Sequence, residues 1–155
     1  EKIWLNPDAY IYKEAAEAIR NAELIVISPG DLYGSILPNL IVKGVKDALS
    51  ESKAKIVYVC NLVTKQGTHN FKASDFKKEI EKYLSREIDF IICNTKKPTQ
   101  NIQDKYKKED SYFVEPDLSG NNIIKDELLE ELEINNLITA RHNSEKTAKL
   151  IMSLI

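Results

Sequence analysis

The chain has 155 residues, of which 43% are hydrophobic and 30% are charged, a balance that favours one soluble domain with a hydrophobic core. Its formal net charge of −2 gives no reason to expect nucleic acid or an anionic membrane surface as a partner. No apolar run approaches the roughly 18–20 residues that a membrane-spanning helix needs, so no membrane partner is expected. No signal peptide is visible either, and we expect a cytoplasmic location.

The cysteines and histidines exclude some kinds of metal site. Cys60 and Cys93 each close an apolar run, and neither belongs to a Cys-x-x-Cys pair. They are predicted to be buried free thiols in a reducing compartment. His69 and His142 are the only histidines and lie far apart in the sequence, which argues against a two-histidine zinc site.

The N-terminal part of the chain predicts a short strand over 2–5, followed by a helix. Asn6 or Asp8 is expected to cap this helix. Small and apolar side chains recur along it at helical spacing and predict close packing against a sheet. These side chains are Ala15, Ala18, Ile19 and Ala22.

The central stretch of the chain, residues 24–39, reads LIVISPGDLYGSILPN. Its first part, 24–27, is short, apolar and rich in β-branched residues, which predicts a buried strand. Residues 28–31 form a dense turn signal. Pro38 suits the first turn of a helix that continues to about Ser50. This order of strand, loop and helix marks the loop as a candidate ligand site, because ligands of parallel sheets bind outside the carboxyl ends of the strands.

The rest of the chain continues the alternation of strand, loop and helix. The predicted elements are a buried strand over 55–60, a polar loop over 61–70, a helix capped by Ser74, a buried strand over 88–93, a helix opened by Pro98, a short strand over 112–114, a brief strand at 123–124, an acidic helix over 126–132, a strand or extended link over 136–140 and a helix capped by Asn143 or Ser144. The inner face of the last helix is predicted to carry Ala148, Ile151, Met152 and Ile155. Near-continuous apolar strands predict one α/β domain over 1–155 with a mainly parallel sheet covered on both faces.

Polar residues gather where three of the predicted strands end. The predicted cluster comprises Asp31, Tyr33, Ser35, Asn39, Asn61 and Asn94. It is rich in hydrogen-bonding groups and poor in strong acids and bases, which suits a polar ligand with hydroxyls, a base or phosphates. The helix start near Pro38 favours an anion, and Lys65 with the 67–69 segment is placed to fold over such a ligand.

Structural roles compete with each of these assignments. Residues 29–30 taken alone fit a plain tight turn better, and Asp31 can bond its own turn. Asn61 and Asn94 can satisfy loop backbone groups instead of a ligand. Arg141, just before the last helix, suits a phosphate, but on sequence physics alone a surface arginine is the better reading.

The sequence defines no reaction by itself. Tyr33 also fits packing against the sheet, and His69 fits a solvated loop residue. Ser28 and Ser35 have no obvious histidine partner, and no G-x-S-x-G elbow occurs. The phosphate-binding fingerprints G-x-G-x-x-G and the P-loop are also absent. We therefore assign no catalytic residue and no metal ligand.

Several longer stretches resemble the motif order of one family. They read PGDLYGSILPNLIVKGVKDAL, SKAKIVYVCNLVTKQGTHNFKASDF, IDFIICN, VEPDL and ITARHNSEKTAKLI. They are similar to the CofD/YvcK family, and within it to the YvcK-like branch, often called gluconeogenesis factor or the UPF0052 group. The resemblance implies a Rossmann-like three-layer α/β fold and covers roughly the second half of a family member. The family's Gly-rich first turn and its early Asp-containing loop have no counterpart in this sequence.

The resemblance also implies functions. The YvcK-like branch implies a regulatory protein of carbon metabolism and of cell wall and cell shape that binds a nucleotide-sugar (UDP-sugar) or another phosphorylated small molecule. One alternative is a CofD-type 2-phospho-L-lactate transferase that acts on a deazaflavin with a divalent metal as cofactor. Another is a half-domain that binds nothing alone and assembles with its missing part or as a homo-oligomer.

Matching positions carry the family's ligand-binding residues over to this sequence. They are Gly30, Asp31, Tyr33, Ser35, Asn39, Asn61, Thr64 and Arg141. Ser28 and Gly34 depart from the family's usual Gly and Thr in the first loop. The second loop, TKQGTHNF, lacks the Pro and the acidic residue that the family often has, which weakens any metal or acid–base role there.

Overall fold

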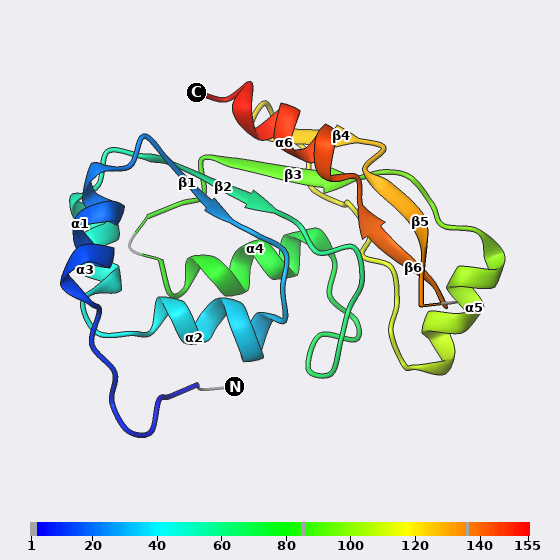
Figure 1. The fold of residues 1–155 in the computed structure, drawn as a ribbon, viewed down its shortest axis with the longest axis horizontal. Helices are drawn as coiled ribbons and strands as arrows, with labels where there is room; N and C mark the ends of the chain where they lie inside the picture. Colours follow the sequence, from blue (N-terminus) through cyan, green and yellow to red (C-terminus); the bar gives the residue numbers. More distant parts are fainter. Residues whose placement is uncertain (1–2, 85, 136) are drawn as a thin grey trace.

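Four parallel strands form the central sheet of the computed structural model, which describes residues 3–84, 86–135 and 137–155. The strands are β1 (Leu24–Ile27), β2 (Lys55–Val59), β3 (Phe90–Asn94) and β4 (Ile123–Asp126). Their order in the sheet is β1-β2-β3-β4, so strands that follow one another in the chain are neighbours (Figure 1). Each crossover segment therefore returns the chain to the amino ends of the strands, and all four carboxyl ends lie together at the opposite edge of the sheet.

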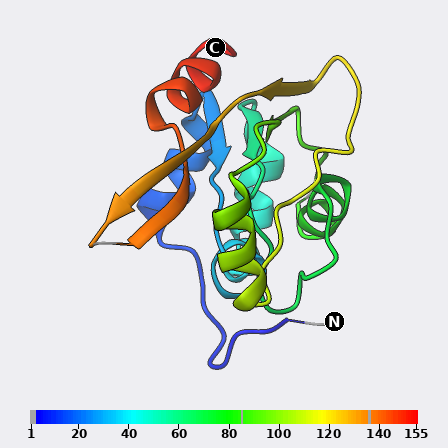
Figure 2. The same ribbon diagram turned by 90° about the vertical axis from the view of Figure 1, so that its right-hand side faces the viewer.

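Helices and a separate ribbon of two strands complete the fold. The helices are α1 (Lys13–Asn21), α2 (Leu37–Leu40), α3 (Val45–Glu51), α4 (Ala73–Glu81), α5 (Gln100–Lys108) and α6 (Ser144–Met152), and a π-helical turn, Leu32–Ile36, leads into α2. The antiparallel ribbon consists of β5 (Leu129–Ile134) and β6 (Leu137–His142). Lys105 of α5 reaches this ribbon, where its Nζ donates to the carbonyl of Ile138 at 2.7 Å. Figure 2 shows the ribbon projecting from the body of the molecule.

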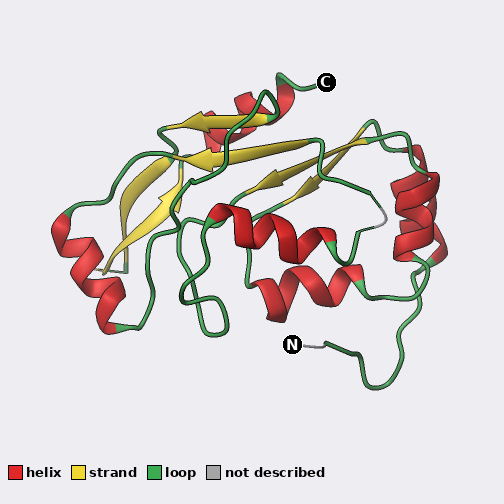
Figure 3. Ribbon diagram, turned by 180° about the vertical axis from the view of Figure 1, so that it is seen from behind, coloured by secondary structure: helices red, strands yellow, loops and turns green. Residues whose placement is uncertain are grey.

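Apolar side chains cover the sheet on both faces, because alternate residues of a strand point to opposite sides. On one face, Ile56 and Tyr58 of β2 are fully buried together with Phe76 and Ile80 of α4. On the other face, Val57 and Val59 of β2, with Ile92 of β3, pack against Leu150 and Ile151 of α6 and against Leu154 just after it. Figure 3 shows the resulting three layers, with α2 and α4 on one side of the sheet and α6 on the other. The predicted Rossmann-like three-layer α/β fold is confirmed.

The strand that begins the central stretch has the predicted bounds but a different place in the sheet. β1 was expected to be buried, yet it stands at the sheet edge and pairs with β2. Val26 keeps 40% of its surface exposed, whereas its partner in register, Val57, is 0% exposed. An apolar run predicts a strand that can be covered on both sides, but it does not specify whether a second neighbour is present.

The N-terminal segment differs from the prediction. Residues 3–5 are not a strand, and residue 2 lies outside the described residues. α1 begins only at Lys13, and Tyr12, which precedes it, supplies no side-chain cap, so neither Asn6 nor Asp8 caps this helix. Asp8 instead forms an ion pair with Lys43.

α1 packs mainly on a helix, although its Ile19 also packs on the core cluster that covers the sheet. Its most extensive contacts are with α3, and the two helices lie side by side near the amino ends of the strands (Figure 1). Ala15 and Ala18, predicted to face inward, are exposed, and Ala16 is the buried residue of the helix.

The long helix predicted from Pro38 to Ser50 is interrupted. Gly44 has a φ of +92°, a conformation that stops a helix and strongly favours glycine. A Cβ on Gly44 would also lie 2.6 Å from Cγ2 of Ile11, so the close approach of the N-terminal segment needs glycine as well. The chain therefore turns between α2 and α3 at this point.

The predicted acidic helix over 126–132 is wrong, because this segment ends β4 and begins β5. Its leucines have helical spacing, but pairing with β6, as in Leu129 opposite His142, determines the structure. Ser74 lies inside the first turn of α4, where Lys72 is the capping position and its N–H donates to Asp75 at 2.9 Å.

The last helix has the predicted cap but a different inner face. Asn143 caps α6 as predicted, by accepting from the N–H of Lys146 at 2.7 Å. Met152 and Ile155, expected on the inner face, are both 63% exposed. Ile151 packs on the sheet as predicted, together with Leu150 and Leu154.

Candidate functional site

The loop after β1 is organised by Asp31. Its Oδ1 accepts from the N–H of Gly34 at 2.7 Å, and its carbonyl accepts from the N–H groups of Ser35 and Ile36 at 2.8 and 2.9 Å. The two carbonyl contacts start the π-helical turn, a feature frequent at functional sites. Asp31 therefore bonds its own turn, as the structural alternative held, while its Oδ2 has no partner among the described residues.

Asn61 links the loops that follow β1 and β2. Its Nδ2 donates to the carbonyl of Gly30 at 2.6 Å, and its Oδ1 accepts from the hydroxyl of Tyr58 at 3.0 Å. Burial raises the pKa of Tyr58 well above its usual value, so this hydroxyl keeps its proton and acts as a donor. The ends of β1 and β2 are thus brought together as predicted. The side-chain amide of Asn61 that joins them is fixed by the buried Tyr58.

The second loop is tied to another segment of the chain. Thr64 is 1% exposed; its N–H donates to the carbonyl of Tyr112 at 2.7 Å and its Oγ1 accepts from the N–H of Tyr112 at 2.9 Å. The predicted strand over 112–114 is reduced to this short pairing, with a bridge between Val63 and Phe113. In this structure Thr64 positions the loop, and its contact with a ligand stays a prediction.

Tyr33 lies against the turn of the second loop. Gly67 has a φ of +86°, and a Cβ built there would lie 3.2 Å from Cδ2 of the Tyr33 ring. Thr68 closes the same turn, since its Oγ1 accepts from the N–H of Lys65 at 2.9 Å. Tyr33 and the second loop, both predicted near the ligand, are therefore adjacent.

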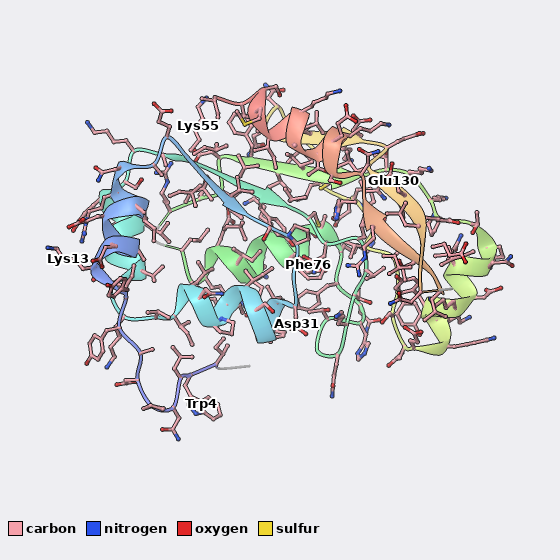
Figure 4. The ribbon with its side chains drawn as sticks, in the orientation of Figure 1. Trp4, Lys13, Asp31, Lys55, Phe76 and Glu130 are labelled. Atoms are coloured by element: carbon pink, nitrogen blue, oxygen red, sulfur yellow. The ribbon has the colours of Figure 1, made fainter. Side chains whose placement is uncertain are left out.

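Asn94 lies beside Asn61, with which it lines a small cavity at the ends of β2 and β3, whereas Arg141 lies on the ribbon. Oδ1 of Asn94 accepts from the N–H groups of Leu128 and Leu129 at 3.0 and 2.9 Å, so this side chain holds the link between β4 and β5. Arg141 stands opposite Glu130 in the ribbon, is exposed and makes no side-chain hydrogen bond to the described residues. Figure 4 shows Asp31 at the end of β1 and Glu130 on the ribbon, well separated in that view.

A groove beside β1 has one polar end. Its volume is about 520 Å³, and Gly30, Ser35 and Asn39 line the end nearest the loop after β1. Asn39 is oriented by its Nδ2, which donates to the carbonyl of Ser35 at 2.7 Å. Three of the predicted ligand-binding residues therefore share one cavity of a size typical for small-molecule sites.

The rest of the groove is apolar, and the sequence did not reveal it. It is lined by side chains of the N-terminal segment, α1, β1, α2 and α3, among them Tyr10, Ile19, Ile25, Ile27, Leu40 and Val45. These residues come from segments that are distant in sequence, and the bridge between Tyr10 and Lys43 brings two of the segments together. No motif marks such a surface in advance.

The cysteines sit side by side in the core as free, buried thiols, as predicted. Hydrogen bonding with Cys93 and burial raise the pKa of the Cys60 thiol well above its usual value. Hydrogen bonding with Cys60 lowers the pKa of the Cys93 thiol, but that side chain is only 1% exposed. The pair therefore belongs to the packing at the ends of β2 and β3.

His142 is the unusual polar group near this pair. Burial lowers its pKa, and a hydrogen bond with the backbone of Cys60 opposes that shift. Its Nε2 is the one buried side-chain nitrogen or oxygen without a hydrogen-bond partner in the part of the chain that the structure describes. The ring is consequently held neutral.

The described residues do not form a metal site by themselves. Within residues 3–84, 86–135 and 137–155, no three His, Cys, Asp or Glu side chains are arranged to hold a metal ion. Asp31 is the one carboxylate of the predicted cluster, and one of its oxygens already caps a turn. The divalent metal implied by the transferase alternative therefore does not fit these residues by themselves.

None of the helices in the described ranges combines the length and the apolar character that crossing a bilayer requires.

Comparison with known proteins agrees with the fold. A family model described as 2-phospho-L-lactate transferase CofD matches residues 1–136. A putative gluconeogenesis factor of Thermotoga maritima is 43% identical over 143 residues, which are 89% of this chain and 46% of that protein. The gluconeogenesis factor of Bacillus subtilis is 32% identical over an aligned length of 163 residues, covering 100% of this chain and 50% of that protein.

A solved structure of a related protein has a similar fold. The crystal structure of a UPF0052 family member from Bacillus halodurans superposes with a TM-score of 0.83 at 34% identity, covering 92% of this chain and 47% of that one. The chain thus spans about half the length of the relatives that it matches. Because the family model matches most of the chain and relatives above 30% identity match nearly all of it, the chain belongs to the CofD family, among whose members it is similar to the gluconeogenesis factors.

Proposed function

We propose that this chain supplies one side of a nucleotide-sugar site in a regulatory protein of the gluconeogenesis factor kind. The observation that carries the proposal is the polar rim at the end of β1. Asp31 Oδ2, the Ser35 hydroxyl and Asn39 Oδ1 have no hydrogen-bond partner among the described residues, while the backbone beneath them is fixed. Carboxylate, hydroxyl and amide groups of this kind bind the hydroxyls of a ribose or a sugar.

The surrounding geometry supports a ligand with both polar and apolar parts. Gly30, Ser35 and Asn39 line the polar end of the groove, and apolar side chains line the remainder. A helical turn begins directly after Asp31, and the amino ends of helical segments favour a phosphate. A nucleotide-sugar combines sugar hydroxyls, phosphates and a flat base, and so matches these three features.

A binding function also accounts for the lack of reactive groups. Among the described residues, Cys60 is a buried thiol with a raised pKa and His142 is a half-buried ring with a lowered pKa. The curated relatives are named gluconeogenesis factors, and these names state no reaction. We further propose that the protein acts in the control of carbon metabolism and of cell wall and shape, in the cytoplasm.

The proposal is tested by calorimetric titration of UDP-glucose into this chain and into the complete Thermotoga maritima relative. We expect binding by the relative and weaker binding by this chain, since the chain spans only about half of such proteins. The variant Asp31→Asn retains an acceptor for Gly34 but removes the charge, and should weaken binding about tenfold, as the loss of one charged hydrogen bond would. Asp104→Asn on the exposed face of α5 is the matched control. No binding by either protein would refute the proposal.

A second candidate is the transferase for which the family model is named, since that model matches residues 1–136. Formation of a phosphodiester on a deazaflavin alcohol, from a guanosine-activated phospholactate donor and a divalent metal, would establish it. The complete relative should be assayed alongside this chain, whose described residues do not assemble a metal site. Turnover by the relative, without any affinity for UDP-sugars, would replace the regulatory proposal.

A further inference from the structure

We propose that a pocket lined by Lys43, Lys46 and Lys82 binds a small phosphorylated metabolite at a second site. This lysine pocket is separate from the polar rim at the end of β1, and its existence does not depend on the nucleotide-sugar proposal.

The lysine pocket lies where α2, α3 and α4 come together. Figure 1 shows α2 and α4 side by side beneath the sheet, with their C-terminal ends toward α3. At this place the structure has a cavity of about 230 Å³, and Leu40, Ile41 and Tyr83 contribute apolar surface to it. This volume is below that of sites for drug-sized ligands and suits a phosphate group on a short carbon chain.

The charge of the lining is one-sided. Lys43, Lys46 and Lys82 line the cavity and no acidic side chain from the described ranges does so, although the chain as a whole has a formal net charge of −2. A hydrogen bond with Asp8 raises the pKa of Lys43, and one with Glu79 raises the pKa of Lys82. Both ammonium groups therefore stay protonated at neutral pH, and lysine ammonium groups are common partners of phosphate.

The two ion pairs leave donors for a ligand. Each ammonium group has three N–H donors, and one carboxylate does not use them all. The side chains of Lys43 and Lys82 are 50% and 54% exposed in spite of their pairs with Asp8 and Glu79. A lysine beside the C-terminal end of a helix can instead complement the helix dipole, which is the structural alternative for Lys82 after α4. That alternative does not account for Lys46, which lies in the first turn of α3, where the dipole disfavours a cation.

The backbone of the lysine pocket is fixed before any ligand binds. The N–H of Lys43 donates to the carbonyl of Ala9 at 3.0 Å, and the carbonyl of Lys43 accepts from the N–H of Ile11 at 2.9 Å. The next residue, Gly44, holds the turn between α2 and α3 with its φ of +92°. A ligand would therefore meet a backbone that is already in place, which lowers the entropic cost of binding.

The lysine pocket adjoins the groove beside β1 without sharing its polar end. Leu40 and Val42 line both cavities, whereas none of the predicted ligand-binding residues lines the lysine pocket. An anion bound there would contact the end of α2, the helix that carries Asn39. A phosphorylated metabolite could thus regulate the polar rim, and this step alone rests on the proposed function.

The test is calorimetric titration of glycerol phosphate into this chain at constant ionic strength. We expect saturable binding with one site per chain. Lys46→Gln and Lys82→Gln should each weaken the binding about tenfold, as the loss of one charged hydrogen bond would. Lys78→Gln is the matched control, because Lys78 is an exposed lysine of α4 that does not line the pocket. The control variant loses the same charge and should bind like the unaltered chain.

Two further measurements sharpen the test. Citrate, a carboxylate anion, should bind several-fold more weakly than glycerol phosphate. In nuclear magnetic resonance spectra, glycerol phosphate should shift the backbone amide signals of Lys43, Gly44 and Lys46, and should leave those of the β5–β6 ribbon unchanged.

The proposal is overturned if glycerol phosphate does not saturate, if the two pocket variants bind it as well as the unaltered chain, or if Lys78→Gln weakens binding equally. It is also overturned if citrate binds more tightly or if the amide signals of the pocket do not move. None of these results involves a UDP-sugar, so the two proposals fail separately.

Discussion

The side-chain amide of Asn61 donates to the carbonyl of Gly30 at 2.6 Å and so ties the end of β2 to the loop after β1. The hydroxyl of Tyr58, whose ring is fully buried, donates to Oδ1 of the same amide at 3.0 Å and so fixes its other end. The core thereby sets the position of the loop that carries the candidate ligand residues, and this arrangement can be tested one contact at a time.

Asn61→Ala should lower the free energy of unfolding by about 1–3 kcal/mol, because it leaves the Gly30 carbonyl and the Tyr58 hydroxyl without their partner. Denaturant melts monitored by circular dichroism measure this loss. Asn101→Ala, on the exposed face of α5, should change stability by less than about 0.5 kcal/mol. Equal stability of the two variants would show that the bridge between the strand ends contributes nothing.

Gly67→Ala should destabilise the protein by about 1–2 kcal/mol, since alanine is strained at a φ of +86° and its Cβ would press on the Tyr33 ring at 3.2 Å. Gly30→Ala is the comparison, because a Cβ at Gly30 would make only ordinary contacts of 3.6 Å. Thermal melts should give a lower melting temperature for Gly67→Ala than for Gly30→Ala. The reverse order would contradict the contact between Tyr33 and the second loop.

His142 should make stability depend on pH. Burial lowers its pKa below the ordinary value of 6.5, so the unfolded chain takes up the proton more readily than the folded chain. The contribution of neutral His142 to the free energy of unfolding is therefore full above about pH 6.5, and it is lost as the pH falls through and below that value. Denaturant melts between pH 5 and 8 would detect the slope of the free energy of unfolding against pH, and His142→Gln should reduce that slope. His69→Gln is the control and should retain it; a slope that survives in His142→Gln would refute the assignment.

The two thiols should be protected from reagents in solution. Cys60 is 2% exposed and Cys93 is 1% exposed, and both are free. We expect neither to react with a disulfide reagent in the native protein, and both to react at once in guanidinium chloride. Rapid reaction of one thiol under native conditions would show that the ends of β2 and β3 open more readily than this packing allows.

Much of the sheet could be predicted because its signals are local. The apolar runs gave β1, β2 and β3 to within about two residues, and the turn chemistry of residues 28–31 located the loop. β5 was misread because its leucines have helical spacing, and only the distant pairing with β6 makes the segment extended. The exposure of β1 was also not predicted, because the sequence of a strand does not indicate how many neighbouring strands it pairs with.

The sequence predicted that the ends of β1 and β2 meet, and the ligand-binding roles of their residues stay predictions. Asn61 does meet the loop after β1, but it acts as a brace to Gly30. Thr64 turned out to be buried against Tyr112, which depends on a pairing across many residues. The groove escaped prediction altogether, because it forms between the N-terminal segment and the residues around Val42 only after folding.

The most direct test of the central claim is the titration of UDP-glucose into the complete Thermotoga maritima relative, compared with its variant at the position matching Asp31. We predict saturable binding with one site per chain, weakened about tenfold when that carboxylate is replaced by an amide. Binding that is unchanged in the variant would remove the loop after β1 from the site. Absence of binding to any UDP-sugar would contradict the nucleotide-sugar account as a whole.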